Sequence, residues 1–267
     1  MNQEAVAIAL NDADPEIRLG AIAEVAANSH ALNDGALDAL IACLGANRKI
    51  VQRRASEALA GLTANNTGIV EKLRTALGHS DARMRWGVAY ALGLIDDALD
   101  LRAMPALLEA LASSDGDVRW AAAELVVRLG KTHREAVGAQ LLTLARDGNL
   151  NARKMALYGL RDVGGASDQL LDAAEHCCAQ NHSLLKMAAL SLISHISAGQ
   201  RASALAIRLL QDDPDEGVRR CAAVALGHIG DRSPQVKQAL VEAASIDGDI
   251  YLKRAAQAAL ARLDAAS

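Results

Sequence analysis

The chain contains no phenylalanine, and aromatic residues make up only 2% of its 267 residues. A core without many large aromatic side chains must be built from alanine, leucine, valine and isoleucine, which suits closely packed helices better than sheets. The four cysteines include no C-x-x-C pair, and Cys177 and Cys178 are adjacent, which is a poor basis for a disulfide framework. These absences favour an all-helical protein of a reducing compartment.

Long apolar runs and an excess of positive charge are also missing. No run approaches the roughly 18 apolar residues that cross a bilayer, and residues 1–10 carry Glu4 but no Lys or Arg, unlike a secretory signal. The net charge is −4, so no overall positive field attracts nucleic acid or an anionic membrane. We therefore expect a cytoplasmic protein that does not bind membranes.

What the chain does contain is one short pattern that recurs eight times. In its clearest copies, residues 84–93 and 218–227, an arginine is followed by small and aliphatic residues. The position of this arginine recurs at steps of 32 to 34 residues, at Arg18, Gln52, Arg85, Arg119, Arg153, Leu185, Arg219 and Lys253. A period this steady is typical of a solenoid of stacked repeats that grows as one continuous unit.

Each period divides into two helical stretches, a variable helix A and a more regular helix B. We predict helix A at residues 4–10, 36–44, 69–77, 104–111, 139–145, 169–177, 202–210 and 236–244. Helix B carries buried positions one residue before, and three, six, seven and ten after, the arginine-type position. Its side-chain cap stands four residues before that position, at Asp14, Asp81, Asp115, Asn149, Asn181, Asp215 and Asp249. Repeat two departs from this rule, with Arg48 at the cap position.

The ends of helix B and the recurring arginines also have structural interpretations. Left-handed C-caps are predicted at or near Gly61, Gly93, Gly130, Gly164 and Gly230. The arginines should stack near the cap aspartate of a neighbouring repeat, as a ladder that fixes the repeats in register rather than as a binding site. Gln52 and Leu185 interrupt this column, so we expect breaks in the ladder there.

Several strings identify a family resemblance. ALGLID at 91–96, AMPALLEAL at 103–111, DVR at 117–119 and ALGHIGD at 225–231 resemble HEAT-like repeats of the phycobilisome-lyase type, and the resemblance covers essentially the whole chain. It implies an all-α, right-handed α-α superhelix of about eight two-helix repeats in a single domain. The repeats are expected at residues 1–30, 31–64, 65–98, 99–131, 132–165, 166–197, 198–231 and 232–267.

One face of helix B concentrates the few aromatic residues. The positions one and five residues after the arginine point away from the buried stripe and should be exposed. Four of the five aromatic residues occupy them, and the resemblance implies that they line a concave groove. The candidate partner-binding residues on this face are Trp86, Tyr90, Trp120, Glu124, Lys154, Tyr158, Lys186, Arg220 and Arg254. Exposed aromatic residues beside Arg and Lys are the types that dominate interface energies, although they could also simply cover neighbouring helices.

The leading hypothesis is a non-enzymatic scaffold that grips an acidic segment of a partner protein in this groove. A bilin lyase subunit or chromophore-handling protein is an alternative that follows from the resemblance alone. A nucleic-acid-binding protein similar to HEAT-like alkylpurine DNA glycosylases is a third, with Trp120 and Glu124 as the suggestive pair, but the net charge argues against it.

No motif for a nucleophile, a phosphate loop or a metalloprotease is present, so we expect no catalytic residues and no cofactor. His176, Cys177, Cys178 and His182 could suggest a soft-metal site. The two cysteines fall in the apolar stretch of helix A, however, which favours buried core residues instead.

Overall fold

The computed structural model describes residues 2–28, 32–63, 68–95, 97–196, 199–246 and 248–265. This part of the chain is all α-helical, with sixteen α-helices and no strand, as predicted. Three of the expected repeat boundaries, at residues 30–31, 64–65 and 197–198, lie outside the described residues. Within the described part, no helix combines the length and the apolar composition of a membrane span.

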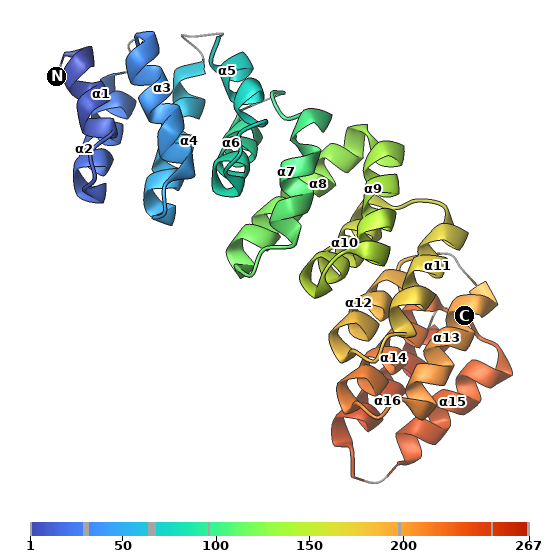
Figure 1. Ribbon diagram of the computed structural model, residues 1–267. Coiled ribbons are helices and arrows are strands. Elements are labelled where there is room, and N and C mark those ends of the chain that lie inside the picture. The colour runs from blue at the N-terminus through green and yellow to red at the C-terminus, as the bar shows by residue number, and fades with distance from the viewer. Residues whose placement is uncertain are drawn as a thin grey trace. The chain divides into compact units, whose positions relative to one another are not determined.

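The chain divides into two compact units, which are described separately. The described part of the N-terminal unit, Met1–Leu129, contains eight α-helices that form pairs, together with the short 3-10 turns η1 and η3, and α8 runs into the next unit. Figure 1 shows each pair as two helices joined by a tight connection. These elements are α1 (Gln3–Leu10), α2 (Pro15–Asn28), α3 (Asp34–Ala42), η1 (Cys43–Gly45), α4 (Lys49–Leu62), α5 (Gly68–Ala76), α6 (Ala82–Leu94), η3 (Leu101–Ala103), α7 (Met104–Leu111) and α8 (Gly116–Thr132).

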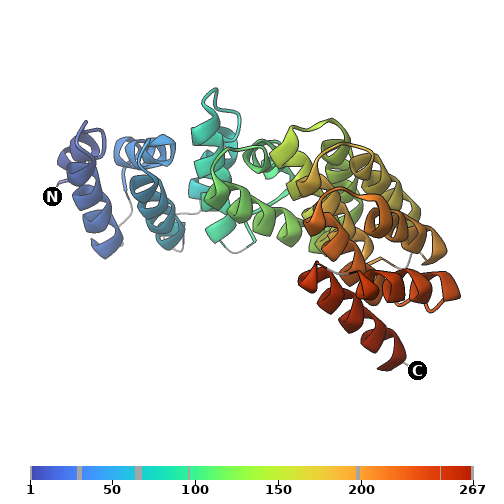
Figure 2. The ribbon, with the colours of Figure 1, turned by 90° about the horizontal axis from the view of Figure 1, so that it is seen from below.

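The C-terminal unit, Gly130–Ser267, continues the same two-helix plan. Each B helix packs on the next B helix and on its own A helix, and Figure 2 shows α14 and α16 side by side. The helices of this unit are α9 (Arg134–Asp147), α10 (Leu150–Val163), α11 (Ser167–Cys178), α12 (Ser183–Ile193), α13 (Gly199–Asp212), α14 (Glu216–Ile229), α15 (Pro234–Ser245) and α16 (Ile250–Ala265).

The buried stripe of helix B is where the spacing places it. In α6 the five positions predicted to be buried are all buried: Met84, Val88, Ala91, Leu92 and Ile95. Because residues at this spacing share one helix face, the stripe packs against the aliphatic side chains of neighbouring helices, in a core cluster that runs from Val6 to Ala98. Burying each of these Leu or Val side chains contributes about 1.5–3 kcal/mol.

The predicted caps are confirmed at six of the seven positions. Asp14, Asp81, Asp115, Asn149, Asp215 and Asp249 each accept a hydrogen bond from a backbone N–H in the first turn of helix B. Arg48 makes no side-chain cap, as expected. The prediction for Asn181 is wrong, because α12 begins one residue later than the spacing suggests and His182 is its N-cap residue.

The glycine predictions are only partly right. Gly164 and Gly230 end their helices with positive φ angles of 78° and 74°. Gly61, Gly93 and Gly130 instead lie inside helices, so they are not left-handed caps. A side chain at two of them would meet a neighbouring helix, since a Cβ would lie 2.6 Å from Leu125 at Gly93 and 2.5 Å from Val163 at Gly130. Close helix packing therefore explains these two glycines.

The arginine ladder exists, but its partners differ from the prediction. Arg85, Arg119, Arg153 and Arg219 donate to backbone carbonyl groups at or just after the end of helix A in their own repeat, over 2.6 to 3.1 Å. The last carbonyl groups of a helix have no partner within it, whereas the cap aspartates are already occupied by first-turn N–H groups. The prediction that these arginines pair with cap aspartates is therefore wrong, because their partners are backbone carbonyl groups.

Gln52 does not break this ladder. Its Nε2 donates to the carbonyl oxygen of Leu44 over 2.6 Å, which is the same type of contact made by a shorter side chain. The expected break at this position is therefore wrong.

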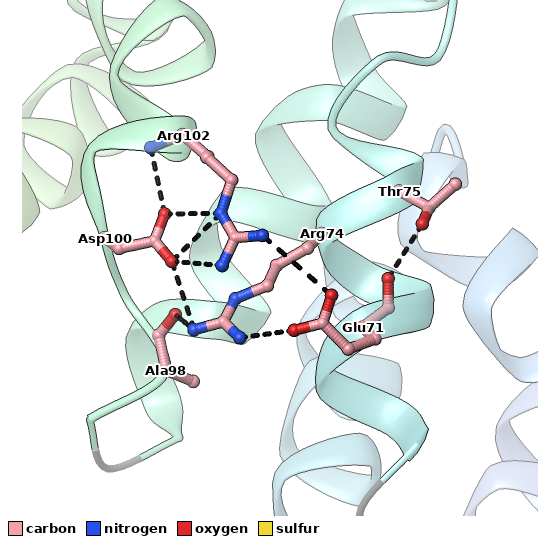
Figure 3. A network of polar contacts seen from close by, with 6 residues as sticks. All are labelled: Glu71, Arg74, Thr75, Ala98, Asp100 and Arg102. Atoms are coloured by element: carbon pink, nitrogen blue, oxygen red, sulfur yellow. Dashed lines mark hydrogen bonds and ion pairs between the residues drawn. The ribbon is translucent and has the colours of Figure 1, made fainter.

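An ion-pair network links the third repeat to the fourth (Figure 3). Arg74 on α5 pairs with Glu71, with an Nη1–Oε1 distance of 2.6 Å, and with Asp100, with an Nη2–Oδ2 distance of 3.0 Å. Asp100 also pairs with Arg102 over 2.8 Å and accepts its backbone N–H at the start of η3. These contacts, above all the side-chain hydrogen bond from Arg102, lower the pKa of Asp100.

Candidate functional site

The aromatic residues predicted to be exposed in the N-terminal unit lie outside the core. Trp86 and Tyr90 are one turn apart on α6 and are half-buried, and their ring centroids are 5.6 Å apart with a tilt of 41°. Trp120 on α8 is 56% exposed, and Glu124 on the same helix is exposed. Both tryptophans therefore remain accessible to a partner.

A pocket of about 440 Å³ opens beside Trp86 and Tyr90. Three consecutive B helices, α4, α6 and α8, provide its walls, which are formed by Lys49, Ile50, Gln52, Arg53, Trp86, Tyr90, Asp117, Val118 and Ala121. Its lining combines aromatic and aliphatic surface with a few charged groups at the rim, which is the composition of a binding pocket.

Lys49 links the two outer walls of this pocket. Its Nζ lies 2.5 Å from Oδ2 of Asp115 and 3.0 Å from Oδ2 of Asp117, so α4 is joined to α8 past the intervening α6. Packed helices are about 8–10 Å apart, and these side chains could not meet across twice that distance on a flat row. This face of the N-terminal unit is therefore concave here.

The same contacts shift the ionisation of the groups involved. Hydrogen bonds to Asp115 and then Asp117 raise the pKa of Lys49, and the bond from Lys49 lowers the pKa of Asp115. The pair is thus held charged at neutral pH. All three side chains remain in contact with water, so these ion pairs contribute little to stability. Their effect is to hold the charged side chains at the rim of the pocket in place.

A second pocket, of about 560 Å³, adjoins the first. It lies between α2 and α4, shares Ile50 with its neighbour, and is lined by Leu19, Ile22, Ala23, Ala26, Ile50, Arg54, Glu57 and Ala58. The predicted exposed columns thus line both hollows in the first three repeats. The size and position of this second pocket were not predicted from the sequence.

The candidate residues of the C-terminal unit do not form an uninterrupted row of free cations. Tyr158 is half-buried beneath the guanidinium of Arg161, 5.6 Å from its ring centroid, and burial raises its pKa. Arg220 approaches Glu216 at 3.4 Å and lies 5.4 Å from the ring centroid of Tyr251. Lys154 is half-buried and Arg254 is exposed.

Lys186 is the clearest departure from the predicted exposed column. Its side chain is only 12% exposed, and its Nζ lies 2.5 Å from Oδ2 of Asp213, which is 2% exposed. Leu190, expected on the same exposed face, is 1% exposed. The predictions that these two positions face solvent are wrong.

One cause explains the discrepancies in the sixth repeat. If Lys186 rather than Leu185 holds the arginine-type position, the steps on either side become 33 residues each. The cap then falls on His182, as the structure shows, and Leu185 joins the buried stripe. Lys186 then stands at the arginine-type position, but its partner is the Asp213 carboxylate of the next repeat rather than a carbonyl group at the end of α11.

Tyr251 was missed by the sequence analysis. This tyrosine is 62% exposed at the start of α16, two residues before the arginine-type position, outside both of the columns considered. Its pairing with Arg220 joins two repeats and could not be recognised without knowing how α14 and α16 face each other.

The cysteines are structural. Cys177 and Cys178 are buried in α11, and Cys177 Sγ lies 3.4 Å from the carbonyl oxygen of Ala145. Burial raises the pKa of Cys178 to about 12 and that of Cys43 to about 11. Within the described residues, no three His, Cys, Asp or Glu side chains gather as a metal site.

Comparison with known proteins supports the fold. No curated protein sequence matches the chain. Among solved structures, the karyopherin Kap121p in complex with Nup53p has a TM-score of 0.68 at 12% identity over 98% of this chain, which spans about 33% of the length of Kap121p. The Escherichia coli protein YibA has a TM-score of 0.57 at 14% identity, with 99% of this chain and 93% of YibA covered. The HEAT-repeat family profile matches residues 37–127 and 180–261, more than half of the sequence. The chain belongs to the HEAT-repeat family.

Proposed function

We propose that this chain is a non-enzymatic scaffold that binds a segment of a partner protein on the B-helix face of its N-terminal unit. The observation that carries the proposal is the Trp86–Tyr90 pair in the wall of the 440 Å³ pocket. Large aromatic side chains held in a partly desolvated hollow are the residues that most often dominate binding energy at protein interfaces.

The surroundings of the pair favour a peptide segment as the ligand. Packing against Tyr90 limits the motion of Trp86, so little side-chain entropy is lost on binding. Trp120 and Glu124 on α8 would extend the contact surface, as the sequence analysis proposed. The candidates for secondary contacts are still Lys154, Tyr158, Arg220 and Arg254. Lys186 is no longer a candidate, because its ammonium group is paired with the buried carboxylate of Asp213.

The similar solenoids are consistent with this proposal. Kap121p has been solved bound to Nup53p and to the extreme C-terminus of the phosphatase Cdc14p. A solenoid of this fold can therefore hold segments of other proteins. The similarity concerns the fold alone, and nothing about the identity of a partner is carried over.

Selection from a random peptide library displayed on phage tests the proposal. Peptides enriched on the wild-type protein should bind Trp86→Ala at least tenfold more weakly, since truncating an interface hot spot costs roughly 2 kcal/mol or more. Ala121→Arg, which places a long side chain at the pocket wall and leaves Trp86 and Tyr90 unsubstituted, should abolish binding equally. The control is Tyr251→Ala, which removes an exposed aromatic side chain from the C-terminal unit.

Peptides that bind the wild type, Trp86→Ala and Ala121→Arg equally would refute this site. The earlier alternatives are separate outcomes of the same set of measurements. Visible absorbance acquired on incubation with bilin would indicate a chromophore-handling protein, and duplex affinity at low salt that is lost on adding salt would indicate nucleic-acid binding.

A further inference from the structure

The two pockets of the N-terminal unit lie on either side of one helix. Pocket one is between α2 and α4, and pocket two extends from α4 across α6 to α8. Ile50 is 44% exposed and lines both of them, so the apolar surface is continuous across the start of α4. An occupant of both pockets must therefore cross α4 rather than lie along it.

The part of α4 between the pockets carries an uneven set of charges. Glu57 pairs with two arginines at once, since Arg53 Nε and Arg54 Nη1 each lie 3.0 Å from one of its carboxylate oxygens. Arg53 lines the second pocket, while Arg54 and Glu57 line the first. Two cations facing one anion leave a surplus positive charge on α4, and both arginine side chains are exposed.

We infer that this surface binds an extended peptide carrying two large aliphatic residues with an acidic residue between them. The inference rests on the proposed function and names the class of partner segment. One aliphatic side chain enters the pocket of Leu19 and Ile22, the other contacts Trp86 and Tyr90, and the acidic side chain meets Arg53 and Arg54.

The spacing of the two anchors follows from helix packing. Neighbouring helices are about 8–10 Å apart, and an extended chain advances about 3.3 Å per residue. Crossing α4 therefore takes about three residues, which places the anchors at positions i and i+3. An amphipathic helix would lie along a groove between two helices and fill only one of these pockets.

The surplus positive charge of Arg53 and Arg54 favours an acidic residue at the centre of the peptide. A carboxylate placed between the two arginines makes charge-assisted hydrogen bonds with guanidinium groups that now share Glu57. A basic residue there would meet the surplus cation directly. The opposite pattern, two apolar anchors around a lysine, should therefore be rejected.

The test uses the full chain and fluorescein-labelled nonapeptides with leucines at i and i+3 and glutamate between them. Fluorescence polarisation should show about tenfold weaker binding when either leucine is replaced by serine. Ala23→Arg, which fills the first pocket, should have a similar effect. The matched control is Ala258→Arg, the same change at the corresponding exposed position of the last repeat.

A double-mutant cycle isolates the charge contact. The combined variant Arg53→Gln with Arg54→Gln should weaken binding of the glutamate peptide about fivefold, but leave the glutamine peptide nearly unchanged. Equal effects on both peptides would overturn the acidic component.

The remaining outcomes separate this inference from the proposed function. If Ala121→Arg abolishes binding while Ala23→Arg has no effect, the Trp86 pocket stands and the two-pocket inference fails. If peptides with a single leucine bind as tightly as those with two, the inference fails as well. Absence of binding by every peptide at millimolar concentration overturns it outright, whereas the library selection decides independently whether the Trp86 pocket binds other segments.

Discussion

A glycine-to-alanine change at Gly227 tests how closely the B helices approach each other. Gly227 lies within α14, and a Cβ built there would be 2.9 Å from both Cα and Cβ of Ala259 on α16. Favourable carbon–carbon contacts lie at about 3.5–4.0 Å, so the helices must separate by roughly 0.6 Å or more. Ala259 cannot rotate away, because its Cα and Cβ are fixed to the backbone.

Two opposing effects set the size of the change. Alanine is favoured over glycine inside a helix by about 0.5–1 kcal/mol. Overpacking a close contact typically costs about 1–3 kcal/mol. Since the contact is with atoms that cannot move independently, we expect the cost to exceed the gain and Gly227→Ala to lose about 1–2 kcal/mol of stability. The melting temperature should fall by roughly 2–8 °C for a chain of this size.

Gly138→Ala provides the matched control in the same unit. Gly138 lies within α9, and the nearest atom to a Cβ there is the carbonyl oxygen of Gly164 at 4.0 Å. This variant should therefore gain about 0.5–1 kcal/mol from helix propensity alone. Thermal and urea unfolding followed by circular dichroism should give opposite signs for the two variants. Because repeats open locally, faster hydrogen exchange should appear first in α16 of Gly227→Ala.

Equal stability of the two variants would refute the reasoning. It would mean that α14 and α16 are farther apart than the 2.9 Å between an added Cβ at Gly227 and Ala259 implies, or that the two helices separate at no cost in free energy. A stabilised Gly227→Ala would be still stronger evidence against close packing at this interface.

Three other predictions follow from the structure. Because burial raises the pKa of Cys178 to about 12, iodoacetamide at pH 8 should modify the half-buried Cys221 first, and mass spectrometry showing rapid native labelling of Cys178 would contradict this. Lys186→Met should lower the free energy of unfolding in urea by about 3 kcal/mol, because it leaves the buried Asp213 carboxylate without its cation. Adding Asp213→Asn to the same chain should recover much of this loss, and a fully stable Lys186→Met variant would disprove the buried pair. The pKa of Asp100 is lowered in the folded state, so its contribution is present above the unfolded value near 3.8 and is lost as the pH falls through the folded value. The stability difference between wild type and Asp100→Asn should thus shrink from pH 7 to pH 2, and a difference independent of pH would exclude the ion pair as its cause.

The sixth repeat shows where pattern reading fails. A step of 32 residues followed by one of 34 placed Leu185 in the arginine column, although two steps of 33 place Lys186 there. A one-residue shift rotates every assignment by about 100° around the helix. For this reason the cap, the ladder and the exposed column were all misplaced together in this repeat, while the same rules succeeded in α6.

The sequence by itself determined the number of repeats, the approximate ends of the helices, most of the N-caps and the buried stripe of helix B. Each of these depends on contacts between residues a few positions apart, and such contacts require particular residue types at regular spacings in the sequence. It also placed Trp86 and Trp120 outside the core.

Only the tertiary structure decided which groups meet across repeats. Lys49 reaches Asp117 across 68 positions, the arginines choose helix-end carbonyl groups over cap aspartates, and two pockets open on either side of α4. These contacts depend on the small rotation between one repeat and the next, which accumulates along the stack and is set by packing at every interface at once. The sequence contains no local pattern that specifies this rotation, so the position and shape of the proposed binding surface had to come from the fold.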